Sequence, residues 1–509
     1  MDYLLGIDLG TSATKSVLFD KNGVVLASST ATYTFDQPKN GWAEQDPDVW
    51  WRAVCQTTND VVSESGIDAA HLKGIGISGQ MHGVVMLDEN GDVIRKSILW
   101  NDGRTAEECA EITDIIGAER LIQITANPAL VGFSAGKILW VRRHEPENFA
   151  RCRHILLPKD YIRYKLTGVF ATEVSDASGM NLLDIRARTW SDEILSKLGI
   201  EKEWLGDVYE SVDITGEVTA AAAAGTGLHP GTPVVGGAGD NAAAAIGVGV
   251  YQSGRAMTTI GTSGVVYAHS DTLAIEPQGR IHTFCSAVPG AWAVMSCTLS
   301  AGLSLQWFRN TCCEQEIAEA KESGTDPYDL MNRLAASSPV GANRLLFLPY
   351  LMGERSPLLD EHARGVFMGL SAMHTKGDLI RAVMEGVSYS QRQCFDILSG
   401  MGLDVNDMTI CGGGARSPLW LQMLSDLYGC TVKTTSLAKE GPALGVAILA
   451  GVGTGVYESI EEAWECLSKT TAETTPDEAD RNAYEPYYAL YKSLYPVLQE
   501  SFLHLACIQ

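Results

Sequence analysis

The 509-residue sequence is poor in positive charge. Its 38 Lys and Arg residues are outnumbered by 62 Asp and Glu residues, which gives a formal net charge of −24 at pH 7. Because nucleic-acid binding needs a basic surface against phosphates, this balance argues against a nucleic-acid partner. It leaves a nucleotide ligand open, since a small cluster of backbone N–H groups can hold phosphate even in an acidic protein.

Long apolar runs and paired cysteines are also missing. The N-terminal sequence MDYLLGIDLG lacks the basic and apolar regions of a signal peptide, and the Ala-rich stretch 220–224 is too short to span a bilayer. The 12 cysteines form no CxxC pair. We therefore expect reduced thiols, a cytoplasmic location and no membrane partner.

The rest of the composition is that of a globular protein, with 45% hydrophobic and 20% charged residues. At roughly 150 residues per domain, the length allows about three domains or two large ones. Predicted helices and short strands alternate along the chain, which indicates layered α/β domains. The clearest helical patterns cover 50–63 and 378–398, and the clearest short strands cover 74–77, 83–87, 233–236 and 408–411.

Two segments have the pattern of antiparallel strands joined by polar turns. The first covers 3–33, with apolar runs at 3–7, 16–19 and 24–28, and the second begins near Arg255. Each carries the triplet Gly-Thr-Ser between two apolar runs, once at 10–12 and once at 261–263. We therefore predict two related halves, 1–247 and 248–509.

Two familiar nucleotide-binding motifs are absent. Gly74-x-Gly76-x-x-Gly79 has the spacing of a dinucleotide fingerprint but precedes a loop and strand rather than a helix. Gly237-x-Gly239-x-x-Ala242 does precede an Ala-rich segment, yet no acidic residue follows about 20 positions on. The sequence GTSATKS lacks the second glycine of a Walker A loop. Neither NAD nor P-loop chemistry is indicated.

The segment 8–15, DLGTSATK, has the composition of a phosphate-binding loop. Gly, Ser and Thr let backbone N–H groups approach phosphate. Asp8 could hold a hydrated Mg²⁺ ion, and Lys15 could meet a phosphate oxygen. A plain hairpin, whose Asp and Thr satisfy their own turn, is the alternative, and the loop by itself favours it.

Two further sites are ambiguous from the residues alone. Asp240 follows a Gly-rich strand end and precedes an Ala-rich helix, which is the position of an N-cap. Met81 and His82 lie in the loop GQMHG, where glycines allow close approach to a ligand, although packing is the simpler interpretation.

Six motifs in order along the chain resemble the FGGY family of carbohydrate kinases. They are GIDLGTSATK, SAGKILW, GGAGDNAAAAIGVG, TTIGTSG, GVFMGLSAMHTKGDLIRAVMEG and ICGGGARSPLW, and together they extend from Gly6 to about Ala450. The resemblance implies an α/β fold of the two-lobed actin and hexokinase type (ribonuclease H-like), with ATP and sugar in a central cleft. It also gives the repeated Gly-Thr-Ser segment a purpose, as paired phosphate loops.

The resemblance implies roles for individual residues. Asp240 would be the general base, and Met81, His82, Asp240 and Asn241 would bind the sugar. The ATP-binding residues would be Gly10, Thr11, Ser12, Lys15, Gly261, Thr262, Ser263, Gly412, Gly413, Gly414 and Arg416. Asp8 would hold Mg²⁺. We expect ATP and a small sugar as ligands, with a homodimer as the candidate assembly.

The loop GQMHG resembles the form found in family members that phosphorylate xylulose, where Met and His line the sugar. The expected reaction is therefore ATP-dependent phosphorylation of D-xylulose to D-xylulose 5-phosphate. Ribulose, gluconate and fuculose kinases share the scaffold and remain alternatives. So does a non-catalytic sugar or nucleotide sensor, whereas an actin-like filament protein is disfavoured. Which of Trp100, Asn101, Asp102 and Arg104 touches sugar stays open.

Overall fold

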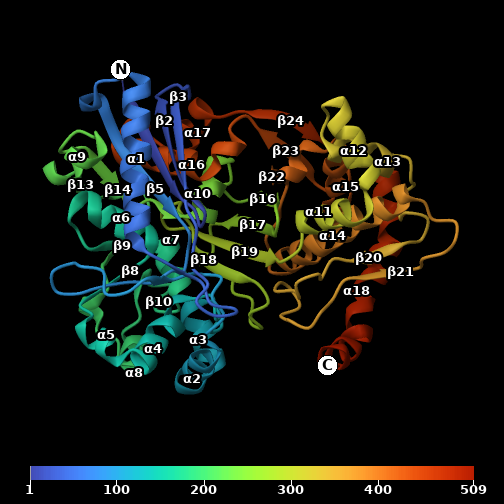
Figure 1. The fold of residues 1–509 in the computed structure, drawn as a ribbon, viewed down its shortest axis with the longest axis horizontal. Helices are drawn as coiled ribbons and strands as arrows, with labels where there is room; N and C mark the ends of the chain where they lie inside the picture. The colour runs from blue at the N-terminus through green and yellow to red at the C-terminus, as the bar shows by residue number, and fades with distance from the viewer. Residues whose placement is uncertain (1, 509) are drawn as a thin grey trace. The chain divides into compact units, whose positions relative to one another are not determined.

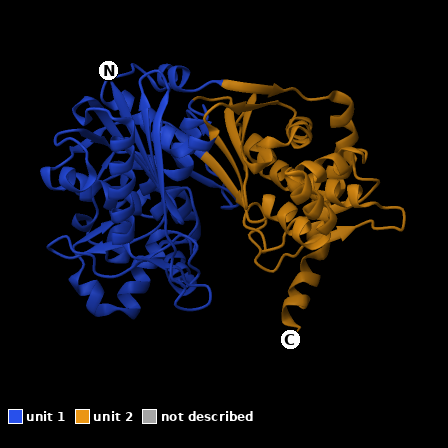
Figure 2. Ribbon diagram, turned by 45° about the horizontal axis from the view of Figure 1, so that its top comes forward, with its two compact units in different colours: residues 1–251, 269–293, 439–469 blue, residues 252–268, 294–438, 470–509 orange. Residues whose placement is uncertain are grey.

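A computed structural model describes residues 2–508 (Figure 1). Its contacts divide the chain into two compact units (Figure 2). Unit 1 contains the described residues through Tyr251 together with His269–Ala293 and Lys439–Lys469. Unit 2 contains Gln252–Ala268, Val294–Ala438 and the described residues from Thr470. The chain thus passes between the units several times, and the predicted boundary near residue 247 stays a prediction.

Unit 1 is built on a mixed sheet in the order β13-β14-β5-β1-β2-β3, with β15 also paired to β5. The first meander is β1 (Tyr3–Leu9), β2 (Ala13–Asp20) and β3 (Val25–Thr32), all antiparallel neighbours. β5 (Leu72–Gly79) runs parallel to β1, and β14 (Pro233–Val235) and β15 (Ala238–Gly239) run parallel to β5. β13 (Ile214–Glu217) is antiparallel to β14 and closes that edge.

Unit 2 repeats this arrangement. Its strands run β19-β17-β16-β22-β23-β24. They are β16 (Arg255–Ile260), β17 (Gly264–Ser270), β19 (Trp292–Thr298), β22 (Asp407–Gly412), β23 (Thr431–Thr435) and β24 (Thr470–Thr474). β16 is antiparallel to β17 but parallel to β22, which is parallel to β23, and β24 is antiparallel to its neighbour. Each unit therefore has a Gly-Thr-Ser turn between its first two strands and the same sequence of strand directions beyond them.

Helices cover both faces of the unit 1 sheet. Leu5, Ile7 and Leu9 of β1 share a buried core with Trp50 and Val54 of α1 (Pro47–Ser65). Because side chains alternate along a strand, the residues between them face the other way. There α16 (Gly441–Gly453) packs on β1 and β5 (Figure 1).

Glycines allow this close packing of α16. A Cβ atom at Gly6 would overlap the carbonyl of Ala443, and one at Gly76 would overlap the carbonyl of Val446. At Gly74 it would come within 2.9 Å of Thr454. The helix lying on the strand thus explains two glycines of the spacing that imitates a dinucleotide fingerprint, Gly74 and Gly76. The third, Gly79, faces Lys159, whose Cβ would lie 2.8 Å from a Cβ atom at that position.

The remaining elements complete each unit. Unit 1 also contains α2 (Ala106–Ile116), α3 (Ala118–Thr125), α4 (Ser134–His144), α5 (Pro146–Arg151), α6 (Pro158–Thr167), α7 (Val174–Ala177), α8 (Asp192–Leu198), α9 (Ala220–Thr226), α10 (Asp240–Gly247), α17 (Ile460–Leu467) and β18 (His282–Cys285). Its two-stranded pairs are β4 (Glu44–Gln45) with β7 (Ser97–Ile98), β6 (Val85–Leu87) with β8 (His154–Leu156), β12 (Asp207–Tyr209) with β9 (Ala171–Glu173), and β10 (Leu183–Asp184) with β11 (Thr189–Trp190). Unit 2 contains α11 (Gly302–Cys312), α12 (Glu314–Ser323), α13 (Pro327–Ala336), α14 (Lys376–Gly400), α15 (Pro418–Tyr428), α18 (Glu478–Cys507), and β20 (Leu346–Leu348) paired with β21 (Val366–Met368).

The predicted helices and strands are confirmed, with shifts of a few residues at their ends. The helix expected at 50–63 is α1, and that expected at 378–398 is α14, whose start is fixed by a capping box between Thr375 and Asp378. The short strands expected at 74–77, 83–87, 233–236 and 408–411 are β5, β6, β14 and β22. Among residues 2–508, no helix has the length and apolar character needed to cross a bilayer.

Candidate active site

Three parallel strands of unit 1 end side by side and bring two carboxylates together. Asp8 on β1 is in register with Ser78 on β5, and Ser78 is in register with Ala238 on β15. Asp240 comes two residues after Ala238, at the first position of α10. Since adjacent strands lie about 4.8 Å apart, this register places Asp8 and Asp240 at one edge of the sheet.

Both carboxylates are held where ionisation is costly. Burial raises the pKa of Asp8 to about 6, although Ser78 Oγ donates a hydrogen bond to it at 3.1 Å. Burial, together with the negative charge of Asp8, raises the pKa of Asp240 to about 7. Both residues nevertheless keep some exposed surface. A raised pKa near neutrality suits a group that must accept a proton during a reaction.

Asp240 is not the N-cap of its helix, so that prediction is wrong. The cap position is occupied by Gly239, whose neighbour Asp240 is already helical. The Asp240 carboxylate instead accepts hydrogen bonds from the backbone N–H and side-chain amide of Asn241, at 2.7 and 3.0 Å. The glycine at 239 is needed because a Cβ atom there would lie 2.9 Å from Met81 Cγ. The side chain of Asp240 is therefore not required to cap the helix.

The backbone just before Asp240 is held by a buried chain of polar groups. The N–H of Gly239 donates to Ser175 Oγ at 3.1 Å, and Ser175 Oγ donates to Glu173 at 2.8 Å. Glu173 also receives a hydrogen bond from Ser211 Oγ at 2.9 Å and lies 3.3 Å from Lys159 Nζ. All four side chains are buried. Sequence reasoning missed this support, because its members come from four separate segments.

Met81 and His82 lie beside the strand ends, in the loop after β5. Met81 contacts Gly239, and the His82 ring stacks on Phe133 with 4.4 Å between ring centroids. His82 Nδ1 lies 2.8 Å from the carbonyl oxygen of Gly179, and the backbone of His82 has a φ of 66°. This left-handed conformation is uncommon for a residue with a side chain and marks a loop that its surroundings hold in place.

Two residues of the SAGKILW segment form hydrogen bonds that fix this loop. Lys137 Nζ donates to the carbonyl oxygen of His82 at 2.8 Å, and Ser134 Oγ donates to the same oxygen at 3.1 Å. Lys137 is fully buried, and burial lowers the pKa of its ammonium group to about 7. The motif therefore fixes the loop that carries Met81 and His82.

The first Gly-Thr-Ser turn (residues 10–12) directs its carbonyl groups into the protein. Tyr33 donates through its hydroxyl to Gly10 O at 2.7 Å and through its N–H to Ser12 O at 2.9 Å. Gln45 Nε2 donates to Thr11 O at 3.1 Å. Within residues 2–508, the N–H groups of Thr11 and Ser12 make no hydrogen bond. Unpaired N–H groups on a turn with anchored carbonyls form the concave surface that binds anions.

The second turn (residues 261–263) is built in the same way. Gly302 N donates to Gly261 O at 2.7 Å, and the N–H groups of Ala301 and Leu303 donate to Thr262 O, each at 3.1 Å. The N–H groups of Thr262 and Ser263 have no acceptor among the described residues. Both turns thus have the arrangement that a phosphate loop requires.

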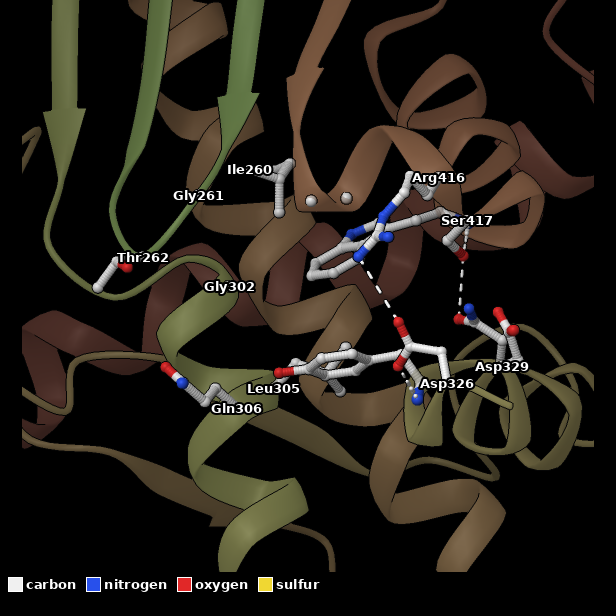
Figure 3. Close-up of a pocket in the computed structure, with 15 residues that line it drawn as sticks. Ile260, Gly261, Thr262, Gly302, Leu305, Gln306, Asp326, Asp329, Arg416 and Ser417 are labelled. Carbon is white, nitrogen blue, oxygen red and sulfur yellow. Dashed lines mark hydrogen bonds and ion pairs between the residues drawn. The ribbon is translucent and has the colours of Figure 1, made fainter. Parts of the chain in front are cut away.

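A cavity of about 500 Å³ opens beside the second turn in unit 2 (Figure 3). Its lining comes from the turn, from α11, from the start of α13 and from the segment that joins β22 to α15. The residues are Ile260, Gly261, Thr262, Gly302, Leu305, Gln306, Asp326, Tyr328, Asp329, Asn332, Gly413, Gly414, Arg416, Ser417 and Trp420. Aromatic and aliphatic walls with a few amides suit a nucleoside, and the volume lies in the usual range for small ligands.

Polar contacts across the cavity mouth join its two walls. Arg416 lies 3.6 Å from Asp326, and Ser417 Oγ donates to Asn332 at 3.0 Å (Figure 3). Gly414 lets this segment approach β16, since a Cβ atom there would lie 2.5 Å from that of Ile260.

Of the predicted ATP-binding residues in this unit, Gly261, Thr262, Gly413, Gly414 and Arg416 line the cavity, whereas Ser263 and Gly412 do not. Ser263 completes the turn by accepting the N–H of Gly261 at 3.1 Å, and Gly412 ends β22 with a φ of 80°. The wall formed by 326–332 was not predicted from sequence.

The segment after β7 separates into buried and exposed residues. Arg104 pairs with both Asp102 and Glu44, each at 2.7 Å, and its guanidinium lies over the Trp42 ring. The side chains of Asp102 and Arg104 are buried. Trp100 remains 39% exposed and donates its indole N–H to Thr11 Oγ1 at 2.9 Å. In this arrangement Asp102 and Arg104 support the fold, and Trp100 borders the first turn.

Comparison with known proteins defines the class. The N-terminal domain of the FGGY family of carbohydrate kinases matches residues 3–247, and the C-terminal domain of that family matches residues 256–454. The chain therefore belongs to the FGGY family of carbohydrate kinases, and the family implies ATP as co-substrate. The predicted α/β fold of this kinase type and the predicted kinase activity are confirmed.

The similar proteins include kinases for two different substrates. The chain is 39% identical to the xylulose kinase of Bacillus subtilis over 495 residues, 97% of each chain. Its structure resembles that of a xylulose kinase from Rhodospirillum rubrum, with a TM-score of 0.90, 30% identity, and coverage of 98% of this chain and 99% of the other. A gluconate kinase from Lactobacillus acidophilus gives a TM-score of 0.91 at 26% identity, covering 99% of both chains. The fold alone therefore does not separate these two sugars.

Proposed function

We propose that this protein transfers the γ-phosphoryl group of ATP to the terminal hydroxyl of D-xylulose, forming D-xylulose 5-phosphate. The observation that carries the proposal is the juxtaposition of Asp240 and Asp8 beside the loop that presents Met81 and His82. The full-length similarity to xylulose kinases points to the same substrate.

Asp240 accepts the proton of the attacking hydroxyl in this proposal. Its carboxylate is fixed by two hydrogen bonds from Asn241, and its raised pKa makes it a stronger base than an ordinary Asp. Met81 and His82 line the sugar, and Asn241 lies next to the base. Their surroundings hold this geometry before the sugar arrives, which reduces the cost of orienting it.

Each unit, taken by itself, has backbone donors suited to the phosphates of ATP. The N–H groups of Thr11 and Ser12 in unit 1, and of Thr262 and Ser263 in unit 2, are donors suited to phosphate oxygens. Gly10 and Gly261 are the first residues of those turns, and the cavity bordered by Gly413, Gly414 and Arg416 takes the adenosine. Lys15 pairs with Glu440 in this structure, so its contact with phosphate requires that ion pair to open.

Asp8 is the residue that would hold Mg²⁺. Carboxylate oxygens such as those of Asp8 are ligands that this ion prefers. A cation there would also offset the negative charge of Asp8, which adds to the effect of burial in raising the pKa of Asp240. Mg²⁺ in kinases is commonly bound through one or two carboxylates together with substrate phosphates and water, so a single Asp is a sufficient protein ligand. When bound, Mg²⁺ neutralises charge on the transferring phosphoryl group.

A substrate panel tests the proposal. ADP release is measured with Mg²⁺ and ATP on xylulose, ribulose, gluconate, fuculose and glycerol, with each product identified by mass spectrometry. Xylulose should give the highest kcat/KM. A higher value on gluconate would assign the protein to the other activity found among its structural neighbours, and no turnover on any sugar would refute the kinase assignment.

We also propose a homodimer and a cytoplasmic location. Unit 2 exposes apolar side chains on and just after the last turns of α18, including Val497 at 76% and Ile508 at 73%. Exposed apolar surface of this kind is a common feature of subunit contacts. Sedimentation equilibrium tests the dimer, and cell fractionation tests the location.

A further inference from the structure

A buried hydrogen-bond network in unit 1 joins the first Gly-Thr-Ser turn to the sugar loop. Thr11 Oγ1 donates to Gln80 Oε1 at 3.1 Å. Gln80 Nε2 donates to Gln45 Oε1 at 3.3 Å, and Gln45 Nε2 donates back to Thr11 O at 3.1 Å. The three residues therefore close a ring that includes both the hydroxyl and the carbonyl of Thr11.

The network is anchored on all sides. Trp50 Nε1 donates to Gln45 Oε1 at 2.6 Å, and Gln45 Nε2 also donates to the carbonyl of Thr34 at 3.0 Å. The backbone N–H of Gln80 donates to Leu9 O at 2.8 Å. Gln45 and Gln80 are each only 1% exposed. Buried amides with all these partners in place are costly to displace, because a lost partner leaves a polar group without water.

Gln80 lies directly before Met81 and His82. A sugar that displaces these two residues would shift the adjacent Gln80. That shift would strain the hydrogen bond between the Gln80 side chain and Thr11. The reverse also holds, since phosphate bound to the N–H groups of Thr11 and Ser12 fixes the same ring. A chain of hydrogen bonds is one physical route by which energetic coupling passes between two sites, and this ring forms such a chain.

We propose that Gln80 is a positioning residue that couples occupancy of the sugar loop to the phosphate-binding geometry of the first turn. The proposal rests on the proposed function, because it takes the loop as the sugar site and the turn as a phosphate site. Gln80 touches neither reacting atom. It acts through Thr11, so its loss should weaken the mutual effect of the two ligands more than the binding of either one alone.

The hydroxyl of Thr11 has a defined part in this coupling. It donates to Gln80 and accepts the indole N–H of Trp100, so its proton is committed within the protein. Thr11 therefore offers phosphate its backbone N–H and not its hydroxyl. Thr11→Ser keeps the hydroxyl and should preserve the coupling, whereas Thr11→Val keeps the shape, loses the hydrogen bond, and should behave like Gln80→Leu.

Calorimetric titration measures the coupling. The dissociation constant of a non-hydrolysable ATP analogue with Mg²⁺ is determined with and without a saturating amount of whichever panel sugar the parent protein phosphorylates fastest. The ratio of the two constants is the synergy factor, and coupled sites typically give about 5–150-fold. We expect a value in this range for the parent and a fall of at least about threefold in Gln80→Leu, as for a direct contact in a shared network.

Matched variants separate coupling from stability. Ser16→Ala removes another buried hydrogen bond in the same unit, from Ser16 to Thr57 at 2.7 Å, and should lower the melting temperature without changing the synergy factor. The double variant Gln80→Leu with Thr11→Val should lose no more synergy than either single variant. If Gln80→Leu does not fold, Thr11→Val carries the test.

Two results would overturn the inference: a parent protein without synergy, or a folded Gln80→Leu protein with the synergy of the parent. Turnover of the parent on the sugar panel is read separately. A failed kinase assignment therefore appears as absent turnover, and a failed coupling appears as an unchanged ratio in an active enzyme.

Discussion

Replacing Asp240 by Asn separates the chemical role of this residue from its structural role. In the structure, Asp240 Oδ1 accepts both hydrogen bonds from Asn241, and an Asn side chain can accept the same bonds through its own Oδ1. The cap of α10 is Gly239, which the change does not touch. Asp240→Asn therefore keeps the shape and local contacts of the site and removes only its ability to take a proton.

The expected loss of activity derives from the role of a general base. Such groups typically contribute about 10²–10⁴-fold to the rate. A loose phosphoryl-transfer transition state needs little activation of the nucleophile, so kcat should fall by about 10²-fold or somewhat more. Sugar binding should persist, because the variant retains the hydrogen-bonding shape of the site.

The same change should raise the free energy of unfolding at neutral and higher pH, although it lowers activity. Each tenfold change in acidity corresponds to about 1.36 kcal/mol, so a rise of the Asp240 pKa from 3.8 to about 7 sets an upper limit of about 4 kcal/mol on the cost of ionising it in the folded protein. Because Asp240 as a residue keeps some exposed surface, solvent screening lowers this to about 1–3 kcal/mol. The folded-state pKa is the higher one, so the cost is absent below about pH 4, grows between pH 4 and 7, and is complete above pH 7. Asp240→Asn, which cannot ionise, should therefore be more stable than the parent at pH 8 and similar to it near pH 4.

Two measurements test this reasoning. Steady-state kinetics gives kcat and the sugar KM at pH 8, and scanning calorimetry gives the melting temperature from pH 4 to pH 8. A folded variant that turns over within about tenfold of the parent would end the assignment of the base. A melting temperature that shows no pH-dependent gain over the parent would show that Asp240 is not held at a raised pKa.

Three further changes test other parts of the site. Burial and, after it, the negative charge of Asp8 raise the pKa of Asp240, so in protein kept free of Mg²⁺ the Asp8→Asn change should lower that pKa. An NMR titration of the Asp240 carboxyl carbon measures it, and an unchanged pKa would contradict the electrostatic link. Asn tolerates the left-handed backbone at φ 66°, so His82→Asn should keep the loop conformation while losing the ring that stacks on Phe133. The sugar KM should rise, and the ATP KM should stay near that of the parent. Equal changes in both KM values would argue against sugar recognition by His82. Gly414→Ala places a Cβ atom 2.5 Å from that of Ile260 and should raise the ATP KM. In the control Gly400→Ala the new Cβ atom meets open space, so the ATP KM should not change. Matching kinetics for both variants would exclude the cavity as the nucleotide site.

Much of the fold could be predicted because its signals are local. The strands of the two meanders show apolar runs broken by turn residues, and α1 and α14 show helical spacing over long segments, so all were found from sequence. The assignment of α16 to unit 1 could not be predicted. This helix is apolar on nearly all sides, so its pattern gives no direction of burial, and its place is decided by glycines such as Gly6 and Gly76 far away in the chain.

The candidate site was predictable to the extent that it lies on motifs. Each predicted site residue follows a predicted strand, in a Gly-rich or polar segment that stands out from the apolar strand before it. This is true of the two turns, of Met81 and His82, and of Asp240. Gln45 and the cavity wall formed by 326–332 lie in segments whose sequence signals only a helix start, an N-cap with proline after it at Asp46 and at Asp326. Their contribution depends on tertiary contacts across long stretches of sequence, which no spacing rule contains. The prediction of Asp240 as a cap failed for a related reason, because Gly239 was required at the cap by its contact with Met81.

The duplicated topology explains why one kind of turn serves two purposes. In each unit a Gly-Thr-Ser turn joins antiparallel strands, and the first of these strands has a parallel neighbour on its other side. That geometry leaves two backbone N–H groups of each turn without an acceptor among residues 2–508 and ties the carbonyls inward. Beside this shared element, unit 1 adds Asp8 and Asp240 at the ends of its parallel strands, the residues proposed above as metal ligand and general base. Unit 2 has Gly413 and Gly414 just after its parallel strand ends, and both line the cavity of about 500 Å³. Under the proposed function, the same kind of turn binds phosphate in each unit, and the residues beside it differ. Substitutions beside the unit 1 turn should therefore change sugar recognition, and substitutions beside the unit 2 turn should change nucleotide recognition.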